Sequence, residues 1–196
     1  MITGSSGNRT ITANTSCFIT FSGITITPAA SSTANAMNIT AGTVTLTLAD
    51  DTVNTLKPQG ETATGTNNNK GKAALRVASS ASLIINGSTG KLIATGGNAQ
   101  AWSDSASWGG SGAGIGGDAG CCFDTAGIYA TPGEDSGSVT INGGVIIATG
   151  GCVSSYWGGS GSGIGGGGDA YHSKKNGASG AVTINGGFVT AVGGAK

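Results

Sequence analysis

The sequence predicts an all-β fold in which about five short coils stack as a parallel β-solenoid, with almost no α-helix. The first observation is a recurring segment: residues 136–151 read SGSVTINGGVIIATGG, residues 179–194 read SGAVTINGGFVTAVGG, and residues 80–97 hold a looser copy. The second is the alternation of apolar and polar residues within each copy, which is typical of a strand with one buried face. A unit this small cannot bury its apolar face alone, so we expect the copies to stack on one another.

The composition supports this fold class and excludes others. The chain has 39 Gly among 196 residues but no three-residue Gly period, which excludes a collagen helix. Disordered chains are also rich in Gly and Ser, but they lack the alternating Val, Ile and Thr found here. The formal net charge is zero and no basic stripe occurs, so nucleic acid is not an expected partner.

The first two coils are predicted from strand patterns and turn residues. The first coil covers 17–27 and turns at Ser22-Gly23, because Gly tolerates the positive φ of a tight corner. Residues 9–13 supply the strand before it. The second coil covers 36–56 and has its corner at Asp50-Asp51.

The later coils carry longer connections. A polar loop over 57–72 precedes the third coil, which covers 74–94. The fourth and fifth coils open with Gly-Ile-Gly-Gly around Ile115 and Ile164, where we expect Ile to point inward and Gly to allow close approach of backbones. The excursions between coils hold most of the aromatic residues, and loops on a rigid scaffold are where function is expected.

The end of the chain raises a question of assembly. No polar or amphipathic segment covers the last predicted coil before Lys196, and an open coil offers unpaired strand edges to its neighbours. We therefore expect residues 1–196 to form a single solenoid domain that is either a slice of a longer surface protein or a subunit that self-assembles.

These residues resemble a known family. The segments NTLK, ASLIINGSTGKLIATGG, GSGIGGGG and SGAVTINGGFVTAVGG look like the carbohydrate-binding parallel β-helix domains of bacterial cell-surface proteins, those of anaerobes especially. The resemblance covers nearly the whole chain and implies a right-handed parallel β-helix of the pectate-lyase type, export, and polysaccharide binding. No catalytic motif of the lyases matches, so the resemblance implies no enzyme activity, and the aromatic and cysteine-containing loops lie outside the repeat pattern.

Aromatic residues in polar Gly/Ser loops give the strongest functional signal. A core filled by Val and Ile does not explain them, and flat rings stack on sugar faces. Trp102 and Tyr156 are the first candidates for ligand contact, whereas Trp108 and Trp157 occupy equivalent positions that also suit lids packed over the Gly-rich strands. Tyr171 completes the set of predicted ligand-binding residues.

Catalysis by a lyase-like helix would need clustered carboxylates that hold Ca²⁺ and a basic residue that takes a proton. Asp118 and Asp169 each follow a Gly-Ile-Gly-Gly motif, so they would stack and either share a cation or face solvent. A Ca²⁺ ion at this pair is the one cofactor considered. The single His, His172, lies in a polar loop. We therefore expect the protein not to be an enzyme.

The chain has four cysteines, an even count that suits disulfides in an exported protein. Cys17 lies in a predicted strand and is expected to be a buried free thiol. Pairing of Cys121 or Cys122 with Cys152 would tie two adjacent loops together. A zinc site is disfavoured because the chain lacks paired Cys-x-x-Cys spacing.

Together these features predict an extracellular, non-enzymatic binding or adhesion module that presents loop aromatics to polysaccharide or to a cell-surface glycan. The first alternative is a structural subunit that stacks end to end through uncapped coils into an extracellular fibre. A phage receptor-binding tip is a third hypothesis. No segment suggests membrane insertion.

Overall fold

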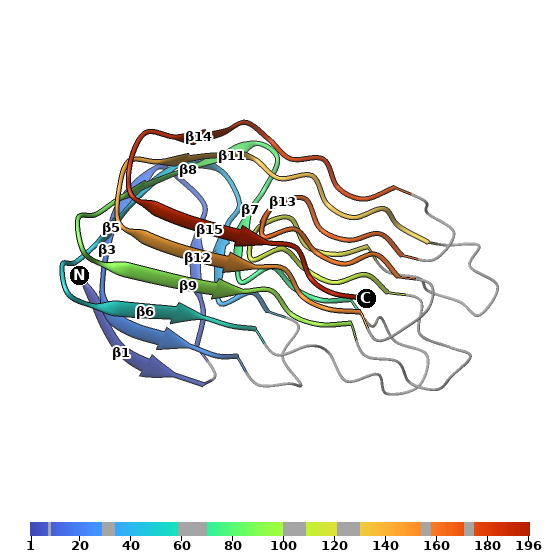
Figure 1. Ribbon diagram of the computed structural model, residues 1–196, viewed down its shortest axis with the longest axis horizontal. Coiled ribbons are helices and arrows are strands. Elements are labelled where there is room, and N and C mark those ends of the chain that lie inside the picture. Colours follow the sequence, from blue (N-terminus) through green and yellow to red (C-terminus); the bar gives the residue numbers. More distant parts are fainter. Residues whose placement is uncertain are drawn as a thin grey trace.

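The computed structural model describes residues 1–7, 9–28, 34–58, 70–99, 109–120, 130–153, 158–170 and 175–196. The regular secondary structure in these ranges is entirely β, with no helix, and every pairing between the named strands is parallel (Figure 1). The strands form two sheets, a larger one that curls and a smaller one. The prediction of an all-β chain is therefore confirmed at the level of its elements.

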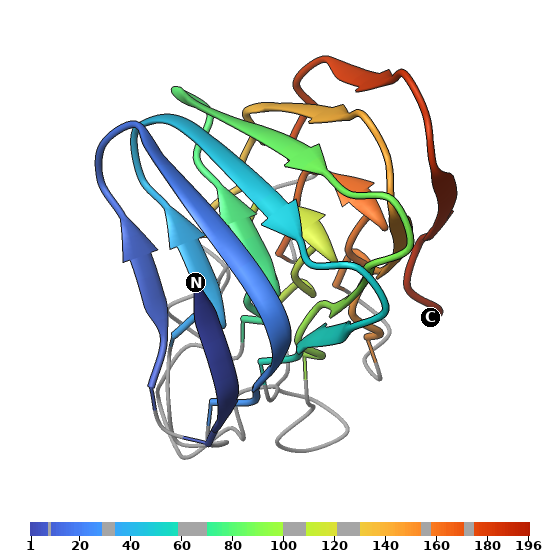
Figure 2. The ribbon, with the colours of Figure 1, turned by 90° about the vertical axis from the view of Figure 1, so that its left-hand side faces the viewer.

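The larger sheet contains ten strands. In hydrogen-bonded order they are β14 (Val182–Ile184), β11 (Ser138–Ile141), β8 (Ala81–Asn86), β5 (Gly42–Leu48), β3 (Cys17–Ile26), β6 (Val53–Leu56), β9 (Lys91–Thr95), β12 (Val145–Thr149) and β15 (Phe188–Val192), with β1 (Ile2–Ser6) also paired to β3. The sheet bends round on itself like half of a barrel (Figure 2). Its two outermost strands, β14 and β15, follow each other directly in the sequence.

The smaller sheet contains five short strands. In order they are β13 (Ile164–Gly165), β10 (Ile115–Gly116), β7 (Leu75–Val77), β4 (Met37–Ile39) and β2 (Ile11–Ala13). Inward side chains of both sheets belong to one hydrophobic core, in which Met37 and Leu75 from the smaller sheet join Leu46 and Leu83 from the larger.

The predicted right-handed parallel β-helix, a solenoid of about five coils, is wrong. The expected corner at Ser22-Gly23 lies inside the ten-residue strand β3, which continues through Gly23 at a φ of 70°. Residues 17–21 of β3 pair with β5, and Thr25 and Ile26 pair with β6. Strand β3 therefore belongs both to the row of strands that contains β5 and to the row that contains β6. Because the two rows share β3, they form a single curled sheet and not the separate faces of a solenoid.

Other local predictions are confirmed. Asp50 and Asp51 form the turn between β5 and β6, where Asp51 has a φ of 57°. Ile141 of β11 pairs with Ile85 on one side and Ile184 on the other, so the three Ile-Asn-Gly corners line up. The amides that follow are also joined, since Asn142 Nδ2 donates to Asn86 Oδ1 at 2.9 Å.

Strand β8 illustrates how the pattern fills the core. Ala81, Leu83 and Ile85 are buried, whereas the residues between them point outward and are half-buried. Burying a Leu or Ile side chain stabilises the fold by about 1.5–3 kcal/mol. This alternation is what the sequence predicted for a strand with one buried face.

In a second part of the molecule the interior is mostly backbone, and its buried side chains include Ala99, Ser111, Ala113 and Val153. Glycine-rich segments that lead into and out of the strands run side by side and are buried (Figure 1). Their backbones bond directly: Gly112 N donates to Gly97 O at 3.1 Å, Gly151 N to Gly112 O at 2.9 Å, and Gly161 N to Gly151 O at 3.2 Å. We call this region, with its three bonds, the glycine core. It consists of the segments 96–99, 109–114, 150–153 and 158–163. The close approach predicted around the Gly-Ile-Gly-Gly motifs is confirmed, because a Cβ on Gly114 would meet the backbones of Gly163 and Thr149.

Candidate binding site

The outer face of the smaller sheet presents a row of polar side chains. Thr12, Asn38 and Arg76 occupy the middle positions of β2, β4 and β7 and are partners in register. The flanking residues of β4 and β7 point into the core and are buried. Gly116 of β10 is the next partner after Arg76 and adds no side chain. The alternation of the strands therefore places Thr, Asn and Arg side by side on the outside.

These residues line a hollow of about 400 Å³. Its lining residues are Thr10, Thr12, Ala34, Asn35, Asn38, Lys72, Arg76, Asp118 and Glu134. All but Ala34 carry a hydroxyl, amide or charged group. The hollow is therefore a polar site built on a rigid sheet.

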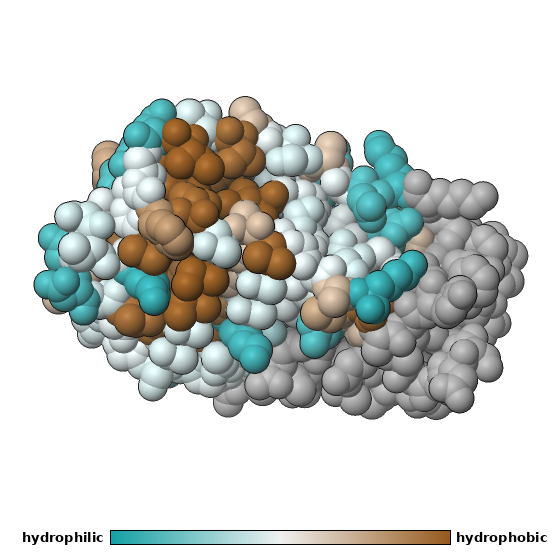
Figure 3. All heavy atoms as spheres, in the orientation of Figure 1, coloured by the Kyte–Doolittle hydropathy of each residue, from teal (hydrophilic) through white to brown (hydrophobic). Residues whose placement is uncertain are grey.

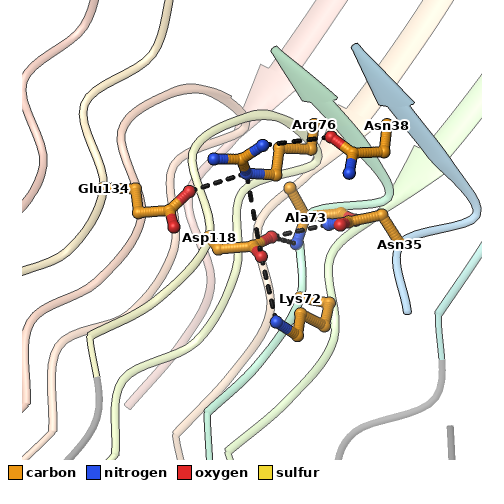
Figure 4. Close-up of polar contacts among 7 residues, drawn as sticks. All are labelled: Asn35, Asn38, Lys72, Ala73, Arg76, Asp118 and Glu134. Carbon is orange, nitrogen blue, oxygen red and sulfur yellow. Dashed lines mark hydrogen bonds and ion pairs between the residues drawn. The ribbon is translucent and has the colours of Figure 1, made fainter. Parts of the chain in front are cut away.

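Asp118 is the anchor of this hollow. It is only 3% exposed, and its carboxylate accepts bonds from Asn35 Nδ2 at 2.6 Å, Ala73 N at 2.8 Å and Lys72 Nζ at 3.2 Å (Figure 4). A buried carboxylate is tolerated only when it is paired and hydrogen-bonded. These three donors supply that compensation and hold the carboxylate in place.

Arg76 links the second carboxylate to the first. Its Nε donates to Glu134 Oε2 at 2.7 Å and lies 3.9 Å from Asp118 Oδ2, and its Nη1 donates to Asn38 Oδ1 at 3.0 Å (Figure 4). A guanidinium has five N–H donors. Toward the described residues the side chain uses two of its nitrogens, so further donors are available to a ligand in the hollow.

The charges of this cluster balance. Lys72 and Arg76 face Asp118 and Glu134, and each carboxylate accepts at least one hydrogen bond from a cation. A general base needs a carboxylate that is available to take a proton from substrate. The arrangement is suited to holding a polar ligand by many directed hydrogen bonds, because both donors and acceptors are already fixed by their neighbours.

A second hollow, also of about 400 Å³, shares Glu134 with the first. Its lining residues are Lys70, Ala119, Thr131, Pro132, Gly133, Glu134, Asp135 and Lys175. Asp135 is held there by Ala178, whose N–H donates to Asp135 Oδ1 at 2.7 Å. Since the two hollows share Glu134, they adjoin, and the second adds both charged residues and apolar ones such as Ala119 and Pro132.

The predicted aromatic ligand-binding residues cannot be placed on this surface. All of them, Trp102, Trp108, Tyr156, Trp157 and Tyr171, lie outside the described residues, as does His172. Their contact with a ligand stays a prediction.

The two aspartates of the predicted carboxylate pair, Asp118 and Asp169, contact different residues. Asp118 bonds to Lys72, Asn35 and Ala73, whereas the N–H of Asp169 donates to Asn176 Oδ1 at 2.9 Å. Among the described residues the two aspartates share no polar partner. Burial raises the pKa of Asp169, while its own backbone and the charge of Lys196 act in the opposite direction. Within the described ranges, no group of three or more His, Cys, Asp or Glu could hold a metal ion.

The cysteines are placed only in part. Cys17 is a free thiol in β3 and is half-buried, which confirms the predicted free thiol but not its full burial. Cys152 is a free, exposed thiol. Cys121 and Cys122, its predicted partners, lie outside the described residues.

Sequence reasoning missed most of the hollow. Of the residues in this network, the sequence pointed to Asp118 but not to Asn35, Lys72 or Glu134. The bond between Asn35 and Asp118 joins residues 83 positions apart, and no local pattern announces it. The outward position of Arg76 between buried Leu75 and Val77 was the one available signal.

Comparison with known proteins adds no relative: no protein-family model, curated protein or solved structure matches this chain. Among the described residues, no helix has the length and hydropathy needed to cross a membrane.

Proposed function

We propose that the protein is a non-enzymatic polysaccharide-binding module and that the polar hollow on the smaller sheet is its ligand site. The observation that carries this proposal is the fixed network of Arg76, Asp118, Glu134 and Lys72 around a hollow of about 400 Å³. Sugar hydroxyls both donate and accept hydrogen bonds, so they complement a surface that offers both. A network held in place before binding loses little conformational entropy when the ligand arrives.

An extended ligand suits this surface better than a compact one. Pockets for small molecules are mostly apolar and enclosing, whereas the first hollow here is polar and shares Glu134 with a second hollow of mixed lining. A polysaccharide chain would place successive sugar units along the two hollows. The loop aromatics Trp102 and Tyr156 are proposed to add ring stacking to this ligand, and the site of action is proposed to be outside the cell.

The absence of catalysis is also part of the proposal. Asp118 and Glu134 are each held by cations, so neither is positioned as a free general base. Incubation with the bound polysaccharide should release no new reducing ends and no unsaturated sugar. Release of either product, lost in Arg76→Ala, would show that the hollow is an active site.

The decisive experiment compares the chain's two arginines. Arg76 lies in the hollow, whereas Arg9 is exposed, lies outside it and bonds through its backbone N–H to Ser6 Oγ. On a polysaccharide array, Arg76→Ala should weaken binding at least about tenfold, the loss of one hydrogen bond to a charged group. Arg9→Ala should bind like the parent.

A gentler variant guards against loss of the fold. Asn38→Ala removes an acceptor of Arg76 at the surface of the hollow and leaves Asp118 with all its donors. It should also weaken binding. Equal binding by the parent, Arg76→Ala and Asn38→Ala would contradict the assignment of this hollow.

A further inference from the structure

The two ends of the molecule differ in what covers their strands. At one end lie β13, β14 and β15, which are outermost in their sheets and have no partner on one side among the described strands. All three are parallel to their neighbours. An outermost strand presents N–H and C=O groups that can pair with another chain.

The same end exposes apolar side chains. Val182 and Ile184 of β14 are 42% and 55% exposed, although their register partners Val139 and Ile141 are fully buried. Phe188 and Val192 of β15 are exposed as well. Figure 3 shows apolar surface over β14 and β15, and this surface continues across the outer face of the larger sheet toward β6. Val182 and Ile184 therefore hold positions that are covered one strand earlier, whereas Phe188 and Val192 continue the outward row of half-buried Val145 and Thr149.

The opposite end differs in its side chains, although β1 and β2 are also outermost strands. Strand β1 pairs with the second half of β3, and the inward residues Phe21, Ile24 and Ile26 there are at most 5% exposed. The exposed apolar residues at the β14–β15 end of one molecule would therefore not find matching exposed core residues along β3 at the other end of a second molecule. This argues against the head-to-tail stacking predicted for an open fibre.

The charge pattern favours a second copy as the occupant. Residues 179–194 contain no Asp, Glu, Lys or Arg, so two identical ends meet without repulsion. Edge strands that avoid pairing carry Lys or Pro, and β14 and β15 carry neither. A surface that is apolar, uncharged and edged by unpaired strands is complementary to itself.

We propose that two copies of this chain associate through the β14–β15 end into a closed two-fold dimer. In such an interface the same patch serves both partners, and a second round of addition is excluded because the open end is used up. The inference goes beyond glycan binding and does not depend on it. It would give the particle two polar hollows and so allow bivalent binding.

The test is the mass of the particle in solution, measured by sedimentation velocity from about 1 to 100 μM, a range that brackets ordinary protein association. The parent should approach twice the mass of one chain as concentration rises. Ile184→Lys and Phe188→Lys should raise the dimer dissociation constant at least about tenfold, because each buries a charge. Phe18→Lys is the matched control, since Phe18 is an exposed apolar residue (89%) on β3, and it should leave the dimer intact.

The Phe188→Lys variant keeps the test valid if Ile184→Lys fails to fold. The side chain of Phe188 is 66% exposed and points away from the core, so its replacement should not disturb the fold. A parent that stays monomeric throughout would overturn the proposal, and so would a mass that keeps growing beyond two chains. A dimer unaffected by Phe188→Lys, or broken equally by Phe18→Lys, would place the interface elsewhere.

Discussion

The curled sheet and the glycine core solve the same packing problem by opposite means. In the sheet, alternate side chains such as Leu83 and Ile85 fill the interior. In the glycine core few side chains are buried, Ser111 and Val153 among them, and the backbones bond to one another through Gly112, Gly151 and Gly161. The first region is stabilised by apolar burial, and the second by hydrogen bonds worth about 0.5–1.5 kcal/mol each.

This difference determines how each region tolerates change. The sheet loses stability when a side chain becomes smaller, because a cavity is left. The glycine core loses stability when any side chain is added, because the neighbouring atoms are backbone and cannot move aside. The following substitutions test this contrast, from the largest expected effect to the smallest.

Gly112→Ala should have the largest effect. A Cβ at this position would meet the backbones of Lys72 and Ala73. We expect the free energy of unfolding to fall by about 4 kcal/mol or more, a value reserved for severe overpacking. Chemical denaturation measures it. Gly7→Ala is the control, because a Cβ added at Gly7 would have no neighbouring atom within 4 Å among the described residues. This substitution should change stability little.

Leu83→Ala tests the apolar region in the opposite sense. Leu83 is 1% exposed, so its truncation leaves a cavity in the core. The expected loss is about 3 kcal/mol by the same measurement. Ser82→Ala, on the outward side of the same strand, is the control. A loss as small as that of Ser82→Ala would show that the core is not packed around Leu83.

Asp118→Asn tests the polar network outside both cores. The amide keeps the shape of the carboxylate but removes its charge from Lys72 and Arg76. A lost bond between charged groups predicts a decrease of about 2 kcal/mol in the free energy of unfolding. Asp135→Asn, at an exposed carboxylate, should cost less. If the two substitutions had equal effects, the burial of Asp118 would not matter to stability.

Asp169→Asn should have the smallest effect, with a sign set by pH. Because burial raises the pKa of Asp169, the folded state holds its proton more tightly than the unfolded chain does. The parent should therefore gain stability from this group as pH falls from neutral through the raised pKa. Asp169→Asn should lack that gain and should be the more stable protein at neutral pH. Unfolding curves across pH that are parallel for the two proteins would contradict this assignment.

The same contrast explains what the sequence could predict. Period-2 alternation located the strands and their buried residues, because in a sheet each side chain reports its own direction. It could not locate the continuation of β3, since a Gly at a φ of 70° serves either a corner or a bend within a strand. That single residue separates the predicted solenoid from the curled sheet.

The candidate site was less predictable than the fold. Arg76 and Asp118 were visible as charged residues in a chain with few, but their meeting depends on distant segments that bring Asn35 and Glu134 beside them. In the glycine-rich segments, moreover, no pattern of apolar residues indicates which neighbouring segment each backbone amide hydrogen-bonds to. Such contacts are set by the three-dimensional fold and leave no local pattern in the sequence.

Amide hydrogen exchange tests the central contrast most directly, because it measures each backbone bond separately. If the glycine core is a true interior, the amides of Gly112, Gly151 and Gly161 exchange only on global unfolding, as slowly as those of Val139 and Asn142 in and beside β11. Exchange of the three glycine amides at the rate of exposed loops, while the β11 amides stay protected, would contradict the account.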